Sequence, residues 1–119
     1  MTVVAWKFAT RHVVPILYGD KSATLRYDPE ESISPGDTLV MERADTGERF
    51  AQAPVDLVGN VSAQWFADRD QWPGHRSYRS TGELLAELRT YYPDADIHPE
   101  TRLTLAKWGA VTPLSGGER

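Results

Sequence analysis

The chain has no cysteine among its 119 residues, no long apolar run and no excess of positive charge. The absence of cysteine excludes disulfides, zinc–thiolate sites, iron–sulfur clusters and thiol catalysis. Charge or proline interrupts every long apolar stretch, so no segment approaches the roughly 20 apolar residues that a membrane span needs. The 13 Lys and Arg against 17 Asp and Glu give a net charge of −4. Nucleic-acid binding would therefore depend on a local basic cluster.

The first residues, Met1 to Lys7, lack the basic region, the apolar region and the cleavage site of a secretion signal, so we expect a cytoplasmic protein. The three histidines, His12, His75 and His98, have no metal-ligand spacing and no cysteine or carboxylate partner at a usual offset. We therefore interpret them as surface or capping residues and expect neither a metal nor a cofactor.

The spacing of apolar and β-branched residues predicts a mainly β chain. Strands are expected over residues 3–8, 22–27, 38–43, 49–61 and 101–108. A short helix over 13–18 ends at Gly19, and the Ser80–Glu83 capping box begins a longer helix that ends at Pro93. Residues 63–79 are expected to form a long loop with one helical turn at most.

This order of elements predicts an α+β, mainly β fold: a small, partly open β-barrel with two short-to-medium helices. The first and last strands should lie in one curved sheet, because a small barrel protects its edges by closing. Lys7 and Lys107 would then flank the mouth of the barrel. Residues 1–108 form the expected domain, and residues 109–119, which are rich in Gly and Ser, form a flexible C-terminal tail.

Residues 19–26, Gly-Asp-Lys-Ser-Ala-Thr-Leu-Arg, form the most informative segment. The glycine ends a helix, Lys21 lies in the turn, and Thr24 and Arg26 share one face of the strand that follows. An ammonium, a hydroxyl and a guanidinium in this arrangement suit an anion, or a carbonyl group that must be polarised. Three solvated polar residues on an exposed sheet face would give the same pattern, and the spacing alone does not separate the two interpretations.

The segment 63–79 interleaves aromatic residues with arginine, as single-stranded nucleic acid requires for base stacking and phosphate contacts. We expect Trp65 and Phe66 to fill the end of the barrel. Trp72 and Tyr78 are as consistent with packing as with base stacking.

The string Gly19-x-Lys21-x-x-Thr24-x-Arg26, followed by a Pro-Gly-Asp turn at 35–37 that opens a strand, resembles the ASCH domain of the PUA-like superfamily. The resemblance spans residues 3–108. It implies a PUA-like β-barrel whose cleft carries these polar residues. It also implies a role in RNA or nucleotide metabolism, often as an RNA-binding module.

One branch of that family consists of small amidohydrolases that deacetylate N4-acetylcytidine with a Lys, a Thr and a Glu. Lys21 and Thr24 match the first two, and the Lys would act as base or nucleophile. Ser77 stands where the Glu is expected, and residues 71–81 contain no carboxylate. The relay is incomplete unless another acid enters the cleft, and the candidates are Glu42, Glu48 and Glu83. We also expect desolvation and Arg26 to lower the pKa of Lys21.

These observations leave three functional hypotheses. The first is a module that binds RNA or a nucleoside-like small molecule, and its candidate binding residues are Arg11, Lys21, Thr24, Arg26, Trp72, Arg76 and Tyr78. The second is an amidohydrolase acting on an acylated or modified pyrimidine nucleoside. The third is a protein-interaction module with a degenerate cleft. An enzyme should have a closed cleft with one carboxylate, an RNA binder an open basic and aromatic groove, and an interaction module an exposed apolar patch.

Overall fold

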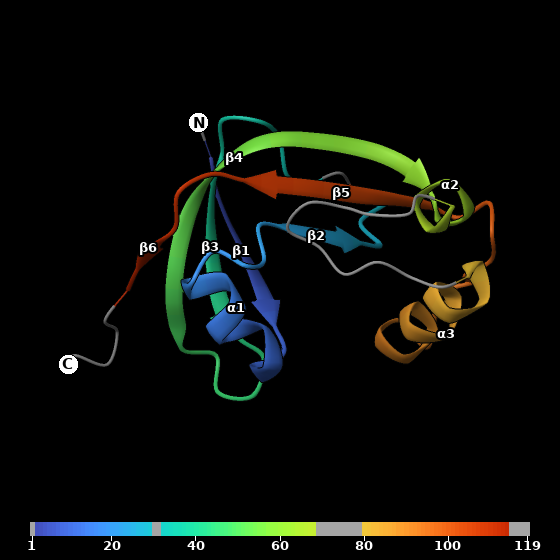
Figure 1. The fold of residues 1–119 in the computed structure, drawn as a ribbon, viewed down its shortest axis with the longest axis horizontal. Coiled ribbons are helices and arrows are strands. Elements are labelled where there is room, and N and C mark those ends of the chain that lie inside the picture. Colours follow the sequence, from blue (N-terminus) through green and yellow to red (C-terminus); the bar gives the residue numbers. More distant parts are fainter. Residues whose placement is uncertain (1, 30–31, 69–79, 115–119) are drawn as a thin grey trace.

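The computed structural model describes residues 2–29, 32–68 and 80–114, and its strands form one curled sheet (Figure 1). The strands are β1 (Val3–Phe8), β2 (Ala23–Arg26), β3 (Thr38–Arg43), β4 (Arg49–Ser62), β5 (Arg102–Trp108) and β6 (Thr112–Pro113). Their order is β1-β3-β4-β5-β2, and β6 pairs with β4. β1 runs parallel to β3, and the other pairs are antiparallel. The expectation that the first and last predicted strands share one curved sheet is confirmed.

Strand β4 connects the two ends of this sheet. It is 14 residues long and pairs with β3 and β6 over its first half and with β5 over its second half. The register with β5 shifts between Val55 and Leu57, directly after Pro54. A proline cannot donate to the ladder, so this is where the sequence predicts a bend or bulge. The strand curves across the whole molecule as a result (Figure 1).

The helices among the described residues are η1 (Thr10–His12, a 3-10 turn), α1 (Val13–Leu17), α2 (Ala63–Ala67) and α3 (Thr81–Tyr91). The Ser80 side chain accepts a hydrogen bond from the Glu83 N–H at 3.2 Å, so the predicted capping box begins α3. Gly19 follows α1 with a φ of +85°, the left-handed conformation expected at that helix end.

Helix α2 has five residues and corresponds to the one helical turn that the sequence allows within residues 63–79; it adds a third α-helix, in the described part of the chain, to the two predicted ones. Ser62 caps it by accepting a hydrogen bond from the Trp65 N–H at 3.1 Å. Phe66 is 1 % exposed and packs in the core as expected. Trp65 does not, because it lies on the outer face of this short helix and is 40 % exposed.

The core divides into two hydrophobic clusters. The first cluster packs α1 against β1, β3 and the first half of β4; it includes Phe8, Ile16, Leu39, Met41 and Trp108. The second cluster packs α2 and α3 against β2 and β5; it includes Ala23, Phe66, Leu84, Leu88 and Leu103.

The predicted tail from Gly109 is in part ordered. Thr112 and Pro113 form β6 opposite Gln52 and Ala51 of β4, and the Leu114 N–H donates to the Phe50 carbonyl at 2.9 Å. Residues 115–119 lie outside the described residues. No helix in the described ranges is long and apolar enough to span a membrane.

Candidate ligand-binding cleft

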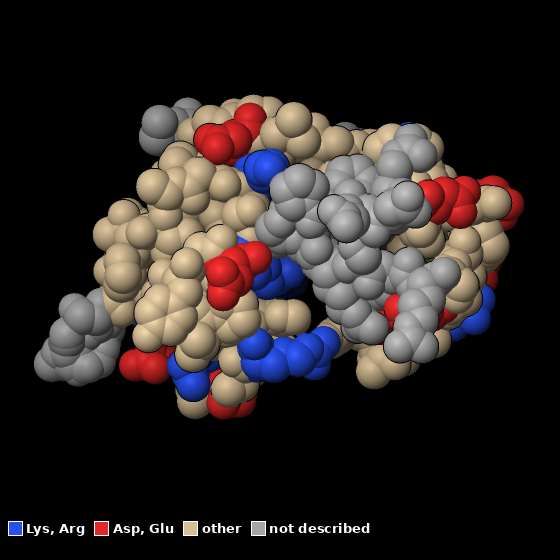
Figure 2. Space-filling model, viewed as in Figure 1, with Lys and Arg blue, Asp and Glu red and all other residues tan. Residues whose placement is uncertain are grey.

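A cavity of about 220 Å³ lies where the two terminal strands of the sheet, β1 and β2, approach helix α3. Its lining residues are Lys7, Phe8, Ala9, His12, Thr24, Leu25, Arg26, Leu84, Glu87, Leu88, Tyr91 and Tyr92. Figure 2 shows Lys and Arg side chains gathered around a hollow in the middle of this face of the molecule. The cleft is thus the seam at which the half-barrel stays open.

Arg26 joins the two strands across this seam. Its guanidinium carbon lies 4.6 Å from the centre of the Phe8 ring and 4.9 Å from that of Trp6. Its Nη2 donates a hydrogen bond to the Lys7 carbonyl. Burial lowers the pKa of Arg26, although the guanidinium stays charged at any physiological pH. Arg26 therefore does not lie solvated on an exposed sheet face, which was one of the two interpretations of its sequence pattern.

Lys21 lies in the turn before β2, beside Arg26. Its Nζ donates to the Ala23 carbonyl at 2.9 Å. Burial, with a smaller contribution from the Arg26 charge, lowers the pKa of Lys21 to about 8, and Glu87 opposes this shift. The predicted direction of the shift and both of its predicted causes are confirmed.

Thr24 is 6 % exposed and lines the cavity from the middle of β2. Among the described residues no hydrogen bond to its hydroxyl is formed, so this group is available to a ligand in the cleft. A hydroxyl can both donate and accept, which suits a carbonyl oxygen or a water molecule equally well.

His12 is half-buried at the end of η1 and lines the cavity. Burial, followed by the charges of Lys21 and Arg11, lowers the pKa of His12 to about 4, while Glu87 raises it. The imidazole is therefore neutral at pH 7. His12 holds the N-cap position of α1, in agreement with the interpretation as a surface or capping residue, but its side chain makes no capping hydrogen bond and lines the cleft.

Glu87 is the carboxylate that lines the cleft. None of the three acids named from the sequence is among the lining residues. Glu42 pairs with Arg49 at 3.3 Å, Glu48 lies exposed in the hairpin, and Glu83 lies in the first turn of α3. Glu87 follows Glu83 by one helical turn. It shares a face of α3 with Leu84, Leu88 and Tyr91, so the helical spacing of that apolar stripe was the signal that could have found it.

The mouth of the cleft carries a cation over an aromatic ring. The Arg11 guanidinium lies 5.6 Å from the centre of the Tyr91 ring, in a shallow depression that adjoins the cleft and shares Glu87 and Tyr91 with it. Lys7 lines the cavity as expected, whereas Lys107 is not among its lining residues, because it pairs opposite Ala23 at the far end of β2.

Of the seven binding residues named from the sequence, Thr24 and Arg26 line this cleft, whereas Arg11 and Lys21 lie beside it and are not lining residues. The other three, Trp72, Arg76 and Tyr78, lie outside the described residues, as does His75.

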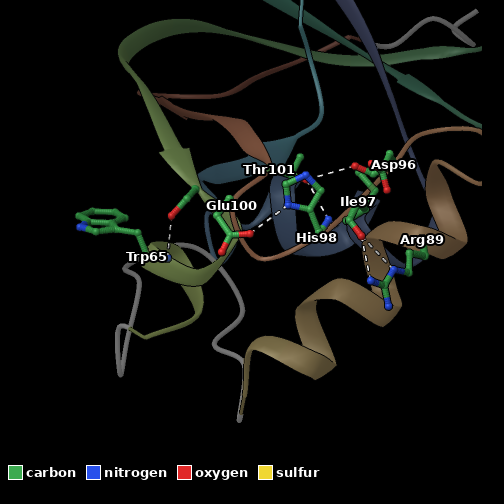
Figure 3. Close-up of polar contacts among 8 residues, drawn as sticks. Trp65, Arg89, Asp96, Ile97, His98, Glu100 and Thr101 are labelled. Carbon is green, nitrogen blue, oxygen red and sulfur yellow. Dashed lines mark hydrogen bonds and ion pairs between the residues drawn. The ribbon is translucent and has the colours of Figure 1, made fainter.

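The connection from α3 to β5 holds the helical wall of the cleft in place (Figure 3). Arg89 donates two hydrogen bonds to the Ile97 carbonyl, at 2.8 and 3.2 Å. Thr101 Oγ1 accepts from the His98 N–H at 2.8 Å, and His98 Nδ1 lies 3.2 Å from a Glu100 carboxylate oxygen. The described residues contain no group of three or more His, Asp or Glu side chains placed to hold a metal ion.

No protein-family model and no curated protein matches the chain in sequence. Solved structures do match in shape. An ASCH protein from Zymomonas mobilis superposes with a TM-score of 0.65 at 11 % identity, over 93 % of this chain and 69 % of the other. An ASCH domain from Lactobacillus crispatus superposes with a TM-score of 0.62 at 16 % identity, over 95 % of this chain and 81 % of the other. The chain has an ASCH-like fold.

Within the ASCH-like fold, the segment 19–26 occupies the open seam of the sheet. The turn after α1 carries Lys21, and β2 carries Thr24 and Arg26. The segment that carries the resemblance in sequence therefore lies at the cleft.

Proposed function

We propose that the cleft binds a nucleotide, either free or as one unit of a single-stranded RNA. The observation that carries this proposal is the contrast between the two sides of the cavity. Lys7 and Arg26 supply charge beside the Thr24 hydroxyl, with Lys21 in the adjoining turn, and Tyr91 and Tyr92 supply rings on α3. Aromatic rings with guanidinium and ammonium groups are what a base with its phosphate requires.

The size and charge of the site support the same class of ligand. Pockets for drug-sized molecules measure about 300–1,000 Å³. A cavity of about 220 Å³ therefore suits a single base with part of its sugar. The chain has a net charge of −4, yet Glu87 is the only carboxylate among the described lining residues, against Lys7 and Arg26. The resemblance to the ASCH family, with its roles in RNA and nucleotide metabolism, agrees with this assignment.

The test is a titration of the protein with uridine 5′-monophosphate and with a fluorescent single-stranded RNA at two salt concentrations. We expect binding that weakens with salt, because each phosphate contact releases counterions. Arg26→Ala should weaken binding at least tenfold. Arg49→Ala, in the exposed hairpin beyond β3, is the matched control and should bind as the wild type does. Undetectable binding of both ligands at low salt contradicts the proposal.

A second candidate function is hydrolysis of an acylated pyrimidine nucleoside such as N4-acetylcytidine. Glu87 favours it, because the family's reaction uses a Lys, a Thr and a Glu, and Glu87 supplies a carboxylate that acts electrostatically on Lys21. In this reaction water adds to the amide carbonyl carbon and the C–N bond breaks, giving acetate and cytidine. Lys21 would accept the proton of the water, Thr24 would hold the carbonyl oxygen, and Glu87 would carry the proton to the leaving amine.

Chromatography of the protein incubated with N4-acetylcytidine tests this second function. Lys21→Ala, Thr24→Val and Glu87→Gln should each abolish turnover, whereas Glu48→Gln, which replaces an exposed acid of the hairpin, should not change it. Turnover that survives Lys21→Ala contradicts the mechanism. The hypothesis of a protein-interaction module has less support, since the large exposed apolar side chains are spread over β1, β4 and the helices.

A further inference from the structure

The cavity follows the free edge of β2 and is not confined to one of its faces. Successive side chains of a strand point to opposite faces of the sheet. Leu25 packs against the second cluster, whereas Arg26 stacks on Trp6 and Phe8 of the first. Thr24, Leu25 and Arg26 nevertheless all line the cavity. A space that touches consecutive residues of a terminal strand lies along its edge, where backbone groups are exposed.

The ladder between β2 and β5 determines which backbone groups point to that edge. The Trp108 N–H donates to the Ser22 carbonyl at 3.0 Å, and the register continues without a shift from Ala23 to Arg26. Hydrogen-bonded residues alternate in an antiparallel pair, so Thr24 and Arg26 direct their backbone groups to β5. Ala23 and Leu25 direct theirs to the free edge.

The Ala23 carbonyl agrees with this alternation, because it accepts a hydrogen bond from Lys21 Nζ. In the part of the chain that the structure describes, no turn, loop or side-chain hydrogen bond uses the N–H or the C=O of Leu25. Leu25 thus presents one donor and one acceptor, side by side, to the cleft.

We propose that the N–H and C=O of Leu25 pair with the Watson–Crick edge of a nucleobase, an inference that rests on the nucleotide-binding function proposed above. A pyrimidine offers the complementary groups: O4 and N3–H in uracil, N3 and N4–H in cytosine. The backbone N–H donates to the ring acceptor, and the carbonyl accepts from the ring donor. A base that is already paired has no free edge, so the cleft takes unpaired bases.

An extended peptide is the other ligand that sheet edges commonly bind, by adding a strand. β2 is too short for that role, with only four residues, and Lys21 already occupies the outward carbonyl of Ala23. A single free donor–acceptor pair matches a planar ring with two adjacent polar groups. The tyrosines on the opposite wall match the same ring.

Methylated ligands test the proposal directly. We expect uridine 5′-monophosphate and its 5-methyl analogue to bind within twofold of each other, because the 5-methyl group lies off the Watson–Crick edge. The 3-methyl analogue lacks the N3–H and should bind at least tenfold more weakly. Equal binding of uridine 5′-monophosphate and the 3-methyl analogue overturns this inference and leaves the proposed function standing. Failure of all three to bind overturns this inference, and it overturns the proposed function as well if the single-stranded RNA also fails to bind.

A pair of substitutions tests the protein side. Proline lacks the N–H and is tolerated on edge strands where that group faces outward. Leu25→Pro should therefore remove the donor and weaken binding of uridine 5′-monophosphate at least tenfold, whereas Leu57→Ala, at an exposed leucine of β4 outside the cleft, should bind as the wild type does. Circular dichroism verifies folding of both variants, and the methylated ligands decide the question if Leu25→Pro does not fold. Unchanged binding by a folded Leu25→Pro protein contradicts the proposal.

Discussion

The two walls of the cleft differ in how they are built. The first wall, Lys7, Phe8, Ala9 and His12, comes from β1 and η1 and rests on the first cluster, which strands far apart in the sequence assemble. The second wall, from Leu84 to Tyr92, is one face of α3 and rests on the second cluster. The first wall carries positive charge, and the second carries two aromatic rings and a carboxylate. A ligand that needs both must therefore be held between two separately supported surfaces.

The largest effect is expected from a substitution beneath one wall only. Phe66 is 1 % exposed at the centre of the second cluster. Phe66→Ala should lower the free energy of unfolding by about 3–5 kcal/mol, because it removes a large buried ring and leaves a cavity. Urea denaturation measures this change. Val14→Ala, at an exposed position of α1, is the control and should change stability by less than about 0.5 kcal/mol. A loss below about 1 kcal/mol for Phe66→Ala would show that the second wall does not depend on this cluster.

A pH titration of stability links the walls, because His12 on the first wall interacts with Glu87 on the second. The pKa of His12 falls from 6.5 to about 4 in the folded protein. Below pH 6.5 the unfolded chain binds a proton that the folded chain does not, so stability falls as the pH drops from 6.5 toward 4. His12→Gln should abolish this loss, which is on the order of 1–3 kcal/mol. Urea midpoints at several pH values measure it. His98→Gln, at an exposed histidine, should leave the acid dependence in place.

Arg26→Lys separates charge from shape at the contact between β2 and β1. A lysine keeps the positive charge but cannot stack a planar group on Trp6 and Phe8. We expect the free energy of unfolding to fall by about 1–2 kcal/mol while the salt dependence of RNA binding stays the same. Urea denaturation and titrations at two salt concentrations measure the two quantities. A wild-type stability for Arg26→Lys would mean that the stacking on the rings contributes nothing.

The smallest effect is expected at the mouth of the cleft. Arg11 is exposed and contacts only the Tyr91 ring among the described contacts, so Arg11→Gln should change stability by about 0.5 kcal/mol at most. It should reduce the slope of log affinity against log salt by about one for single-stranded RNA, as the loss of one phosphate contact does. Arg102→Gln, whose side chain bonds to Asn60 away from the cleft, should leave the slope unchanged. An unchanged slope for Arg11→Gln would place the phosphate elsewhere.

Local patterns account for what the sequence predicted well. The capping box and the spacing of Leu84, Leu85 and Leu88 define α3, and the glycine after α1 defines the turn that carries Lys21. Glu87 lies on that same stripe. The resemblance does not indicate it, because the family's acid precedes the helix.

Contacts between distant residues account for what the sequence did not predict. The parallel pairing of β1 with β3 has no local signal, and it brings Trp6 and Phe8 to Arg26. The displacement of His12 into the cleft follows from the same pairing, since η1 begins two residues after β1 ends. The pairing of Thr112 and Pro113 with β4 is equally non-local, because a short segment after a glycine gives no strand pattern by itself.

The length of β4 has a consequence for how the protein opens. One continuous strand contributes Phe50, Ala51, Ala53 and Val55 to the first cluster and Val61 to the edge of the second. Disruption of either cluster would therefore disturb the pairing of β4, on which the other cluster also depends. Backbone amides in the middle of β4 and in β5 should therefore exchange with solvent deuterium only through global unfolding, and those of η1 and α1 through smaller fluctuations. Local opening of the cleft would then involve its helical and turn segments, while the strands beneath it stay paired.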